Sequence, residues 1–222
     1  NIIVCSRNLE NCQEVADRLA KEKGIKTLAL QCDVRNPEEL ERVFQQSIEG
    51  FGRIDILVNN SGASWGANVL EMPLDAWHKV MDINLTAVFL LSRMVAQHMI
   101  DNGYGGSIIN ISSTSGLRAT DGSGLDAVGY SVSKSAVNHL TKELAKRWGR
   151  YGIRVNAIAP GFFPTKMTKV VLERIGDRVN VGNPMGRLGN DEDLKGLAVF
   201  LASDASAYIN GQVIAVDGGA SA

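Results

Sequence analysis

The amino-acid sequence predicts an α/β protein whose parallel sheet is covered by helices on both faces. Short runs rich in β-branched residues alternate with longer stretches whose apolar residues repeat with a period of about 3.6. Strands that alternate with helices in this way pair in parallel, because each helix returns the chain to the same end of the sheet. Neither a linker nor a repeat interrupts the alternation. We therefore expect one doubly wound domain over residues 1–222.

The expected elements follow the chain in order. Strands are expected at 2–5, 26–32, 54–58, 106–112, 153–158 and 212–216. Helices are expected at 8–23, 37–51, 84–102, 130–149 and 191–203, with a shorter one near 74–80. Clear signals mark two of the helix starts. Asn36 is an N-cap residue before Pro37 and two acidic residues, and Asn190 precedes a similar acidic turn.

Composition limits the classes of function. The 222 residues are 45% hydrophobic and 21% charged, which suits a globular domain with a large core. There are 23 basic and 24 acidic residues with no run of one sign, so neither nucleic acid nor an anionic membrane is expected as a partner. The longest apolar stretches are shorter than the ~18 residues of a membrane span.

Cysteine and histidine positions argue against metal chemistry. Cys5, Cys12 and Cys32 lack metal-binding spacing, and Cys5 and Cys32 fall in expected strands. Buried free thiols fit a reducing compartment, so a cytoplasmic protein is expected. The three histidines are scattered, and none has a second ligand at metal-binding spacing. We expect no metal site.

A tyrosine and a lysine four residues apart give the strongest functional signal. Tyr130 and Lys134 fall on one expected helix, where residues i and i+4 share a face. An ammonium group beside a phenol favours the phenolate, so the pKa of Tyr130 is expected to fall below its usual value of about 10. Such a phenol can pass a proton to or from a carbonyl oxygen. Taken alone, the pair is more typical of a surface lysine beside a core tyrosine.

Other short motifs surround this pair in a fixed order. They are Ile54–Ala63 (IDILVNNSGA), Asp82–Asn84 (DIN), Gly106–Ser113 (GSIINISS), Ile153–Gly161 (IRVNAIAPG) and Val216–Gly219 (VDGG). In this order and at these intervals, the sequence resembles the short-chain dehydrogenase/reductase family from its first residue to its last. The resemblance implies a Rossmann-like fold and an NAD(P)-dependent oxidoreductase that interconverts a ketone and a secondary alcohol.

The resemblance implies a role for four residues at the catalytic centre. Tyr130 is then the acid/base, while Lys134 lowers its pKa and binds the nicotinamide ribose. Ser113 donates a hydrogen bond to the substrate oxygen. Asn84, at the head of its helix, holds a water that connects Lys134 to solvent, or serves only as an N-cap. Ser112 is the competing serine, but strand alternation and the family spacing favour Ser113.

The resemblance also implies a set of cofactor-binding residues at the strand ends. NADP(H) is favoured over NAD(H), because the first strand ends without a carboxylate for the ribose 2′-hydroxyl. Arg7 instead offers a planar fork for a 2′-phosphate, although a solvent-exposed arginine is the alternative. The set comprises Ser6, Arg7, Asp33, Val34, Asn60, Ser61, Gly62, Tyr130, Lys134, Pro160, Gly161, Phe163 and Thr165.

Three features depart from the family pattern. Asn-Asn-Ala-Gly reads Asn-Asn-Ser-Gly at 59–62, and the interval from Ser113 to Tyr130 is longer than usual. The glycine-rich turn that should approach the pyrophosphate, between a strand and a helix, is missing. We expect the first strand, this turn and the first helix ahead of Asn1, with the missing strand central in the sheet. The chain is then a fragment of a longer natural protein, and it is expected to bind nucleotide poorly or not at all.

Two further segments carry expectations from the resemblance. Segment 162–190 interrupts the alternation and resembles a substrate lid, whose apolar residues suit a lipophilic substrate or only pack the lid down. The helix at 84–102 is apolar nearly all round. With the helix at 130–149, it is expected to form the interface of a homodimer or homotetramer. Deep burial within a monomer is the alternative.

The substrate, a small carbonyl or alcohol compound, stays open between two classes. A 3-oxoacyl thioester reductase would use the apolar lid, whereas a gluconate or polyol 5-dehydrogenase would need polar groups such as Arg118, Asp121 and Asp126. Two other functions are less favoured. Sugar epimerases and dehydratases with the same Tyr and Lys usually have a longer C-terminal domain. A non-catalytic nucleotide-binding protein would not need the intact Ser, Tyr and Lys.

Overall fold

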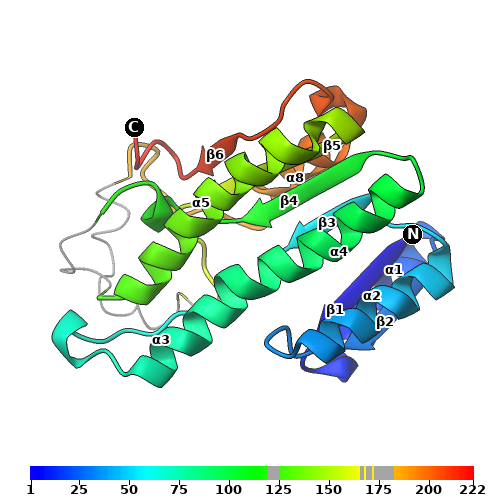
Figure 1. The fold of residues 1–222 in the computed structure, drawn as a ribbon. Coiled ribbons are helices and arrows are strands. Elements are labelled where there is room, and N and C mark those ends of the chain that lie inside the picture. Colours follow the sequence, from blue (N-terminus) through cyan, green and yellow to red (C-terminus); the bar gives the residue numbers. More distant parts are fainter. Residues whose placement is uncertain (120–125, 166–167, 169–171, 173–182) are drawn as a thin grey trace.

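The computed structural model describes residues 1–119, 126–165, 168, 172 and 183–222, and it alternates strands with helices as expected (Figure 1). The strands are β1 (Ile2–Ser6), β2 (Thr27–Gln31), β3 (Ile56–Asn59), β4 (Gly106–Ile111), β5 (Ile153–Pro160) and β6 (Val213–Val216). The helices are α1 (Leu9–Lys23), α2 (Pro37–Phe51), α3 (Leu74–Met81), α4 (Ala87–Asp101), α5 (Val128–Trp148) and α8 (Lys195–Ala202). Short 3-10 turns span Val69–Glu71, Thr114–Gly116, Gly149–Tyr151 and Asp204–Ser206.

The first 51 residues form a β-α-β-α unit in which β1 and β2 pair in parallel. The side chain of Asn8 accepts a hydrogen bond at the start of α1, and Gly24 ends that helix in the left-handed conformation, with φ of 63°. Asn36 caps α2 and Pro37 occupies its first turn, as the sequence predicts. Capping residues therefore fix both helices of this unit.

The other four strands form a second parallel sheet in the order β3-β4-β5-β6. Successive residues of β4 point to opposite faces, so Ile108 packs with α4 and α5 whereas Ile109 packs with Leu201 of α8. Figure 1 shows α4 and α5 on one side of this sheet and α8 on the other. The side chains of Ile108 and Ile153 are 0% exposed. Both faces are covered, as predicted.

A single long helix covers one face of this sheet. A π-helical turn, Asp82–Thr86, joins α3 to α4, so the helix runs without interruption over Leu74–Asp101. The sequence predicts two separate helices here. By length and composition alone, this is the one helix in the described part of the chain that could cross a membrane. It packs against α2, α5, β3 and β4, so it lies within the helical layer over the sheet.

An open slot separates the two sheets. Within the described part of the chain, no strand pairs with the free edge of β1 or with that of β3. A cavity of about 250 Å³ lies between these edges, and Val4 and Val58 are among its lining residues. Ile56 and Val58 of β3 are 44% and 49% exposed. Beside the slot, α2 packs on α4 through a cluster that includes Leu40 and Ala87, and this contact holds the two sheets together.

The observed element ends lie close to the predicted ones, with one larger difference. The last helix begins at Lys195 and not at 191. Asn190 accepts a hydrogen bond from the backbone of Glu192, and Arg187 forms an ion pair with Asp193 at 2.6 Å. These contacts hold the acidic residues in a turn ahead of the helix. Asn190 therefore accepts a capping hydrogen bond as predicted, but it caps this turn and not the helix.

Candidate active site

The predicted catalytic residues gather where β4 ends and α5 begins. Ser113 follows β4 by two residues, and Tyr130 and Lys134 lie on the first two turns of α5. The turn that follows Ser113, Thr114–Gly116, packs against α5. Ligands of open parallel sheets bind outside the carboxyl ends of the strands, so this cluster lies at the expected edge of the sheet.

Ser113, Tyr130 and Lys134 are linked to one another. The Lys134 side chain is 4% exposed, and its Nζ donates to the carbonyl oxygen of Ile111 at 2.7 Å. The same Nζ lies 5.7 Å from the centre of the Tyr130 ring. Ser113 is 8% exposed; its Oγ accepts from the Ser115 N–H at 3.2 Å, and its side chain also hydrogen-bonds Tyr130. The trio therefore forms one connected cluster.

Burial dominates the acid–base properties of this cluster. It raises the pKa of Tyr130 above 10, and the hydrogen bond with Ser113 offsets part of that rise. Burial also lowers the pKa of Lys134 to about 8. The pKa of Tyr130 is therefore raised and not lowered as expected, and the Lys134 Nζ is bonded to the Ile111 carbonyl oxygen and not to the phenol. Near neutral pH, Tyr130 is a protonated phenol that can donate its proton.

Asn84 lies inside the π-helical turn and not at the head of a helix. Its Oδ1 accepts from the Ala63 N–H at 2.8 Å, and its Nδ2 donates to the Ala63 carbonyl oxygen at 2.9 Å. The same Nδ2 also donates to Ser133 Oγ at 2.9 Å, and Ser133 donates to the Tyr130 carbonyl oxygen at 2.7 Å. Asn84 therefore joins the segment after β3 to the catalytic helix. Single π turns are frequent at functional sites.

Ser112, the competing serine, is committed to other partners. Its Oγ donates to Asn138 Oδ1 at 2.5 Å and lies 3.2 Å from the carbonyl oxygen of Lys134. Its side chain is 2% exposed. The Ser113 hydroxyl, in contrast, is the one that contacts Tyr130. The structure thus places the two serines as the sequence argument expects.

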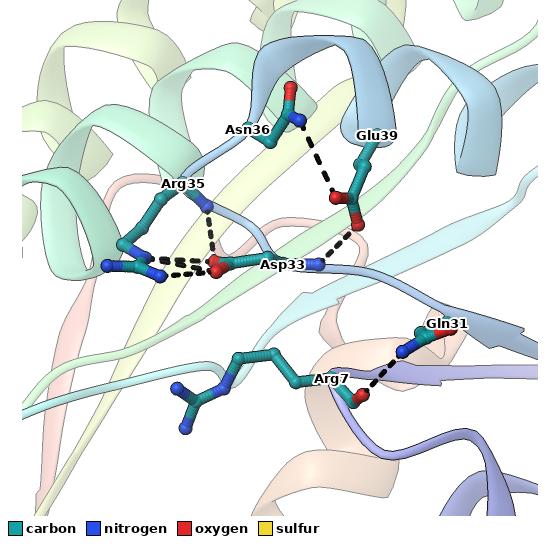
Figure 2. A network of polar contacts seen from close by, with 6 residues as sticks. All are labelled: Arg7, Gln31, Asp33, Arg35, Asn36 and Glu39. Carbon is teal, nitrogen blue, oxygen red and sulfur yellow. Dashed lines mark hydrogen bonds and ion pairs between the residues drawn. The ribbon is translucent and has the colours of Figure 1, made fainter.

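Figure 2 shows a polar network around the end of β2, where Asp33 and Val34 belong to the predicted cofactor-binding set. Arg35 pairs with the Asp33 carboxylate through Nε, at 3.1 Å to both oxygens, and through Nη2, at 2.5 Å. This pairing lowers the pKa of Asp33 to about 2. The Asp33 N–H donates to Glu39 at 2.8 Å. Sequence reasoning missed Arg35, although its position two residues after Asp33 at a strand end was a usable signal.

Arg7 extends into the same region, whereas Ser6 does not. The side chain of Arg7 points away from Gln31, toward the side where Arg35 lies (Figure 2). Its charge also helps to lower the pKa of Asp33. The Ser6 hydroxyl donates to the Asn8 carbonyl oxygen at 3.0 Å and lies 3.0 Å from Cys12 Sγ. In this conformation the Arg7 guanidinium can contact an anion. The Ser6 hydroxyl is instead hydrogen-bonded to the Asn8 carbonyl oxygen of its own loop.

The segment after β3 opens toward the slot. Asn60, Ser61 and Val34 line the 250 Å³ cavity, so the ends of β2 and β3 share one hollow. Gly62 is exposed at the next position. Three of the predicted cofactor residues therefore come together here.

The segment after β5 lies against the segment after β6. Pro160 is the last residue of β5, and a Cβ on Gly161 would lie 2.7 Å from the Cβ of Asp217, so no side chain fits there. Phe163 lines a second cavity of about 140 Å³, and the Thr165 N–H donates to Thr168 Oγ1 at 2.9 Å. This second cavity is bounded by Phe162, Phe163, Asn183, Met185, Arg187, Leu188, Gly189, Asp193, Val216, Asp217 and Gly218.

Parts of the lid and of the Ser–Tyr loop, including Asp121, lie outside the described residues. Arg118 is described; its Nη2 donates to the Ala220 carbonyl oxygen at 2.8 Å. Asp126 is exposed, and its carbonyl oxygen accepts from the Ala67 N–H. The described residues contain no cluster of histidine, cysteine and acidic residues that could hold a metal ion.

Comparison with known proteins places this geometry in a family. A family model described as enoyl-(acyl carrier protein) reductase matches residues 1–221. A 2-dehydro-3-deoxy-D-gluconate 5-dehydrogenase of Dickeya dadantii is 40% identical over 202 residues, which cover 88% of this chain and 77% of the relative. A gluconate 5-dehydrogenase of Gluconobacter oxydans is 37% identical, with 98% and 84% covered. A 3-oxoacyl-(acyl-carrier-protein) reductase of Thermotoga maritima is 38% identical, with 84% and 74% covered.

Solved structures agree with this assignment. A short-chain type dehydrogenase/reductase from Mycobacterium marinum superposes with a TM-score of 0.93 at 37% identity, covering 98% of this chain and 84% of that one. A gluconate 5-dehydrogenase from Burkholderia cenocepacia, in complex with NADP and tartrate, gives 0.91 at 35% identity with the same coverage. The chain therefore belongs to the short-chain dehydrogenase/reductase family, and it is an oxidoreductase that acts on CH–OH groups.

Proposed function

We propose that the protein interconverts a ketone and a secondary alcohol with NADP(H), and that Tyr130 transfers the proton. The observation that carries this proposal is the contact between Ser113 and Tyr130 at the carboxyl edge of the sheet, beside a buried Lys134. Two hydroxyl groups that converge on one point suit a carbonyl oxygen, which can accept a hydrogen bond from each.

The residues divide the work of the reduction among them. Ser113 donates to the carbonyl oxygen and fixes its direction. Tyr130 gives its phenol proton to that oxygen as negative charge develops there, and the phenolate that remains is stabilised by the nearby Lys134 ammonium. Asn84 holds the segment after β3 against α5, and in this proposal it also holds the water that connects Lys134 to solvent. The bound nicotinamide supplies or accepts the hydride.

The residues at the strand ends fit a dinucleotide. Val34, Asn60 and Ser61 come together after the carboxyl ends of β2 and β3, where open parallel sheets bind nucleotides, so this is where the adenosine half can bind. We assign Gly62, Pro160, Phe163 and Thr165 the same role, and Ser6 as well once its hydroxyl leaves the Asn8 carbonyl oxygen. NADP(H) is preferred because, among the described residues, Arg7 pairs with no carboxylate and its side chain projects toward the side where Arg35 lies. In support, one similar structure is a complex with NADP.

Two substrate classes remain candidates, each with its own observation. A 3-oxoacyl thioester is favoured by the apolar wall that Phe162, Phe163 and Leu188 give the 140 Å³ cavity. A sugar acid is favoured by Arg118, a cation that lies five residues after Ser113 and can pair with a carboxylate. The similar curated proteins include dehydrogenases and reductases of both kinds.

Steady-state turnover tests the proposal. The chain, alone and with a strand, a glycine-rich turn and a helix fused ahead of Asn1, is supplied with NADPH or NADH. It is assayed with a 3-oxoacyl thioester and with a 5-oxo sugar acid in the reductive direction, and with gluconate in the oxidative one. NADPH-linked reduction of one ketone that is lost in Tyr130→Phe supports the assignment. Turnover that survives in Tyr130→Phe, or a preference for NADH, contradicts the proton transfer or the cofactor preference respectively.

The assembly and the compartment are part of the same proposal. Phe89 of α4 and Val132 of α5 are 40% and 42% exposed, as side chains at a helical dimer interface would be in a single chain. We place the protein in the cytoplasm as a homodimer or homotetramer, in keeping with its three free cysteines. Light scattering on the purified protein measures the oligomeric state, and Phe89→Glu should shift it toward monomer.

A further inference from the structure

Buried hydrogen bonds join the turn that carries Ser113 to the catalytic helix α5. Ser112 Oγ donates to Asn138 Oδ1 at 2.5 Å, and Asn138 Nδ2 donates to the carbonyl oxygen of Gly116 at 3.0 Å. Ser112 and Asn138 are 2% and 8% exposed, so water does not compete for these bonds. We call Ser112, Asn138 and Gly116 the clasp.

The clasp also brings two stretches of backbone into direct contact. A Cβ on Gly116 would lie 2.6 Å from the backbone carbon of Lys134 and 2.7 Å from the backbone nitrogen of Ser135. Glycine alone leaves room for this approach, which occurs at the catalytic lysine. The turn therefore cannot shift toward α5, and the Asn138 bond keeps it from moving away.

Ser113 lies between the members of the clasp. Its carbonyl oxygen accepts from the Gly116 N–H at 2.9 Å, and its Oγ accepts from the Ser115 N–H. Ser112 precedes it directly, so both flanks of Ser113 are anchored to the helix that carries Tyr130. We propose that Ser112 and Asn138 are positioning residues that hold the Ser113 hydroxyl against Tyr130. The proposal rests on the proposed function, since the aligned pair is the one that binds the carbonyl oxygen.

A second buried network on α5 provides the matched control. Thr141 is 0% exposed, accepts from Asn110 Nδ2 at 3.0 Å and donates to the Val137 carbonyl oxygen at 2.8 Å. It lies three residues beyond Asn138 on the same helix. One of its hydrogen bonds leads to β4 and the other stays within α5, so neither reaches the Ser113 turn. Thr141→Val thus removes buried hydrogen bonds of the same kind without touching the clasp.

Kinetics of the full chain separate positioning from stability. Asn138→Ala and Ser112→Ala should each lower kcat by about 10²-fold, the loss typical of a displacement of roughly 1 Å in a catalytic group. Both should keep the KM for nucleotide within about twofold, because nucleotide contacts are untouched. Thr141→Val should lower the melting temperature by a similar amount yet keep kcat. The double variant should lose little more than the larger single variant, because one hydrogen bond joins the two residues.

Two readouts need no substrate and therefore separate this proposal from the proposed function. In Asn138→Ala, hydrogen exchange of the Ser115 and Gly116 amides should speed up, and the Tyr130 phenol should titrate at higher pH once Ser113 moves away. Tyr130→Phe identifies that phenol among the tyrosines. Unchanged exchange and titration in Asn138→Ala, or equal changes in Thr141→Val, would overturn the positioning role. If no ketone is reduced by the wild-type chain even with the strand, turn and helix fused ahead of Asn1, the proposed function fails while these readouts still decide on the clasp.

Discussion

The four-stranded sheet and the two-stranded sheet carry different parts of the site and are built to different degrees. In the first, β4 and β5 are covered on both faces, and Ile108, Ile153 and Val155 are 0% exposed. In the second, Ile2 is 40% exposed and one edge of β1 borders the slot. The proposed catalytic trio belongs to the covered sheet, whereas Arg7 and Asp33, which are proposed to bind the cofactor, belong to the open one. The proposed catalytic residues thus lie on a well-packed sheet. The residues proposed to bind the adenosine half lie on a sheet that is held by fewer contacts.

The largest effect is expected from a strand placed in the slot. Two open parallel edges and a 250 Å³ cavity can accept one more strand between β1 and β3. A strand, a glycine-rich turn and a helix fused ahead of Asn1 should raise the free energy of unfolding by more than about 5 kcal/mol, a large share of a domain's stability, and should create NADPH affinity. Denaturant titration and calorimetry measure both.

The control for this fusion is a Gly/Ser segment of equal length, which should change neither quantity. A cooperative melt and tight NADPH binding by the chain of 222 residues alone would show that the two-stranded sheet is complete as it stands. The contrast between the sheets would then be wrong.

Tyr130→Phe probes the covered sheet. The change removes the phenol that donates the proton and should lower kcat by about 10²–10⁴-fold, the usual range for acid/base catalysis. Nucleotide affinity should change little, because the ring remains. Tyr104→Phe is the control, since Tyr104 precedes β4 whereas Ser113 follows it, and the Tyr104 hydroxyl accepts from the Ile54 N–H. Near wild-type turnover in Tyr130→Phe would exclude this phenol as the acid.

The lowered pKa of Lys134 should make the free energy of unfolding depend on pH. Its pKa is about 8 when folded and about 10.5 when unfolded, so the unfolded chain binds more protons between these values. The free energy of unfolding should therefore rise with pH across this window, by about 2 kcal/mol from roughly pH 7.5 to 9.5. Lys134→Met should lose this rise. If the free energy of unfolding changes equally with pH in the wild type and in Lys134→Met, burial does not lower the pKa of Lys134.

Arg7→Asp gives the smallest expected effect and probes the open sheet. It replaces a cation by an anion at the proposed 2′-phosphate position and should weaken binding of 2′,5′-ADP by roughly 1–3 kcal/mol, the size of a charged hydrogen bond. Binding of 5′-AMP should be unaffected. Arg35→Gln is informative beside it, because it exposes the Asp33 carboxylate and should weaken the same ligand. If Arg7→Asp and Arg35→Gln weaken 2′,5′-ADP and 5′-AMP equally, neither arginine contributes to recognition of the 2′-phosphate.

Much of the fold and the trio could be predicted because local signals and the fold agree. The cap at Asn36 acts within one turn of the chain, so it depends little on tertiary contacts. The pair Tyr130 and Lys134 needs only the helix period to share a face. Strand alternation likewise separates Ser112 from Ser113.

What could not be predicted depends on packing across the chain. The pKa of Tyr130 rises because of burial, which a sequence does not display. Asn84 was expected at a helix start, but its partners are Ala63 and Ser133, each many residues away. The pairing of Arg35 with Asp33 depends on how the chain turns after β2. Each of these features is set by contacts between separate elements.

The π turn at Asp82–Thr86 determines how the long helix would respond to the loss of a residue. A π turn holds one residue more than an α turn, so the helix on either side of it follows two different registers. Deleting a single residue there would restore uniform α geometry while α3 keeps its orientation relative to α4, because the wider π turn takes up the extra residue. With the extra residue, one continuous helix presents Asn84 to Ser133 of α5 while Ala76 and Val80 stay buried.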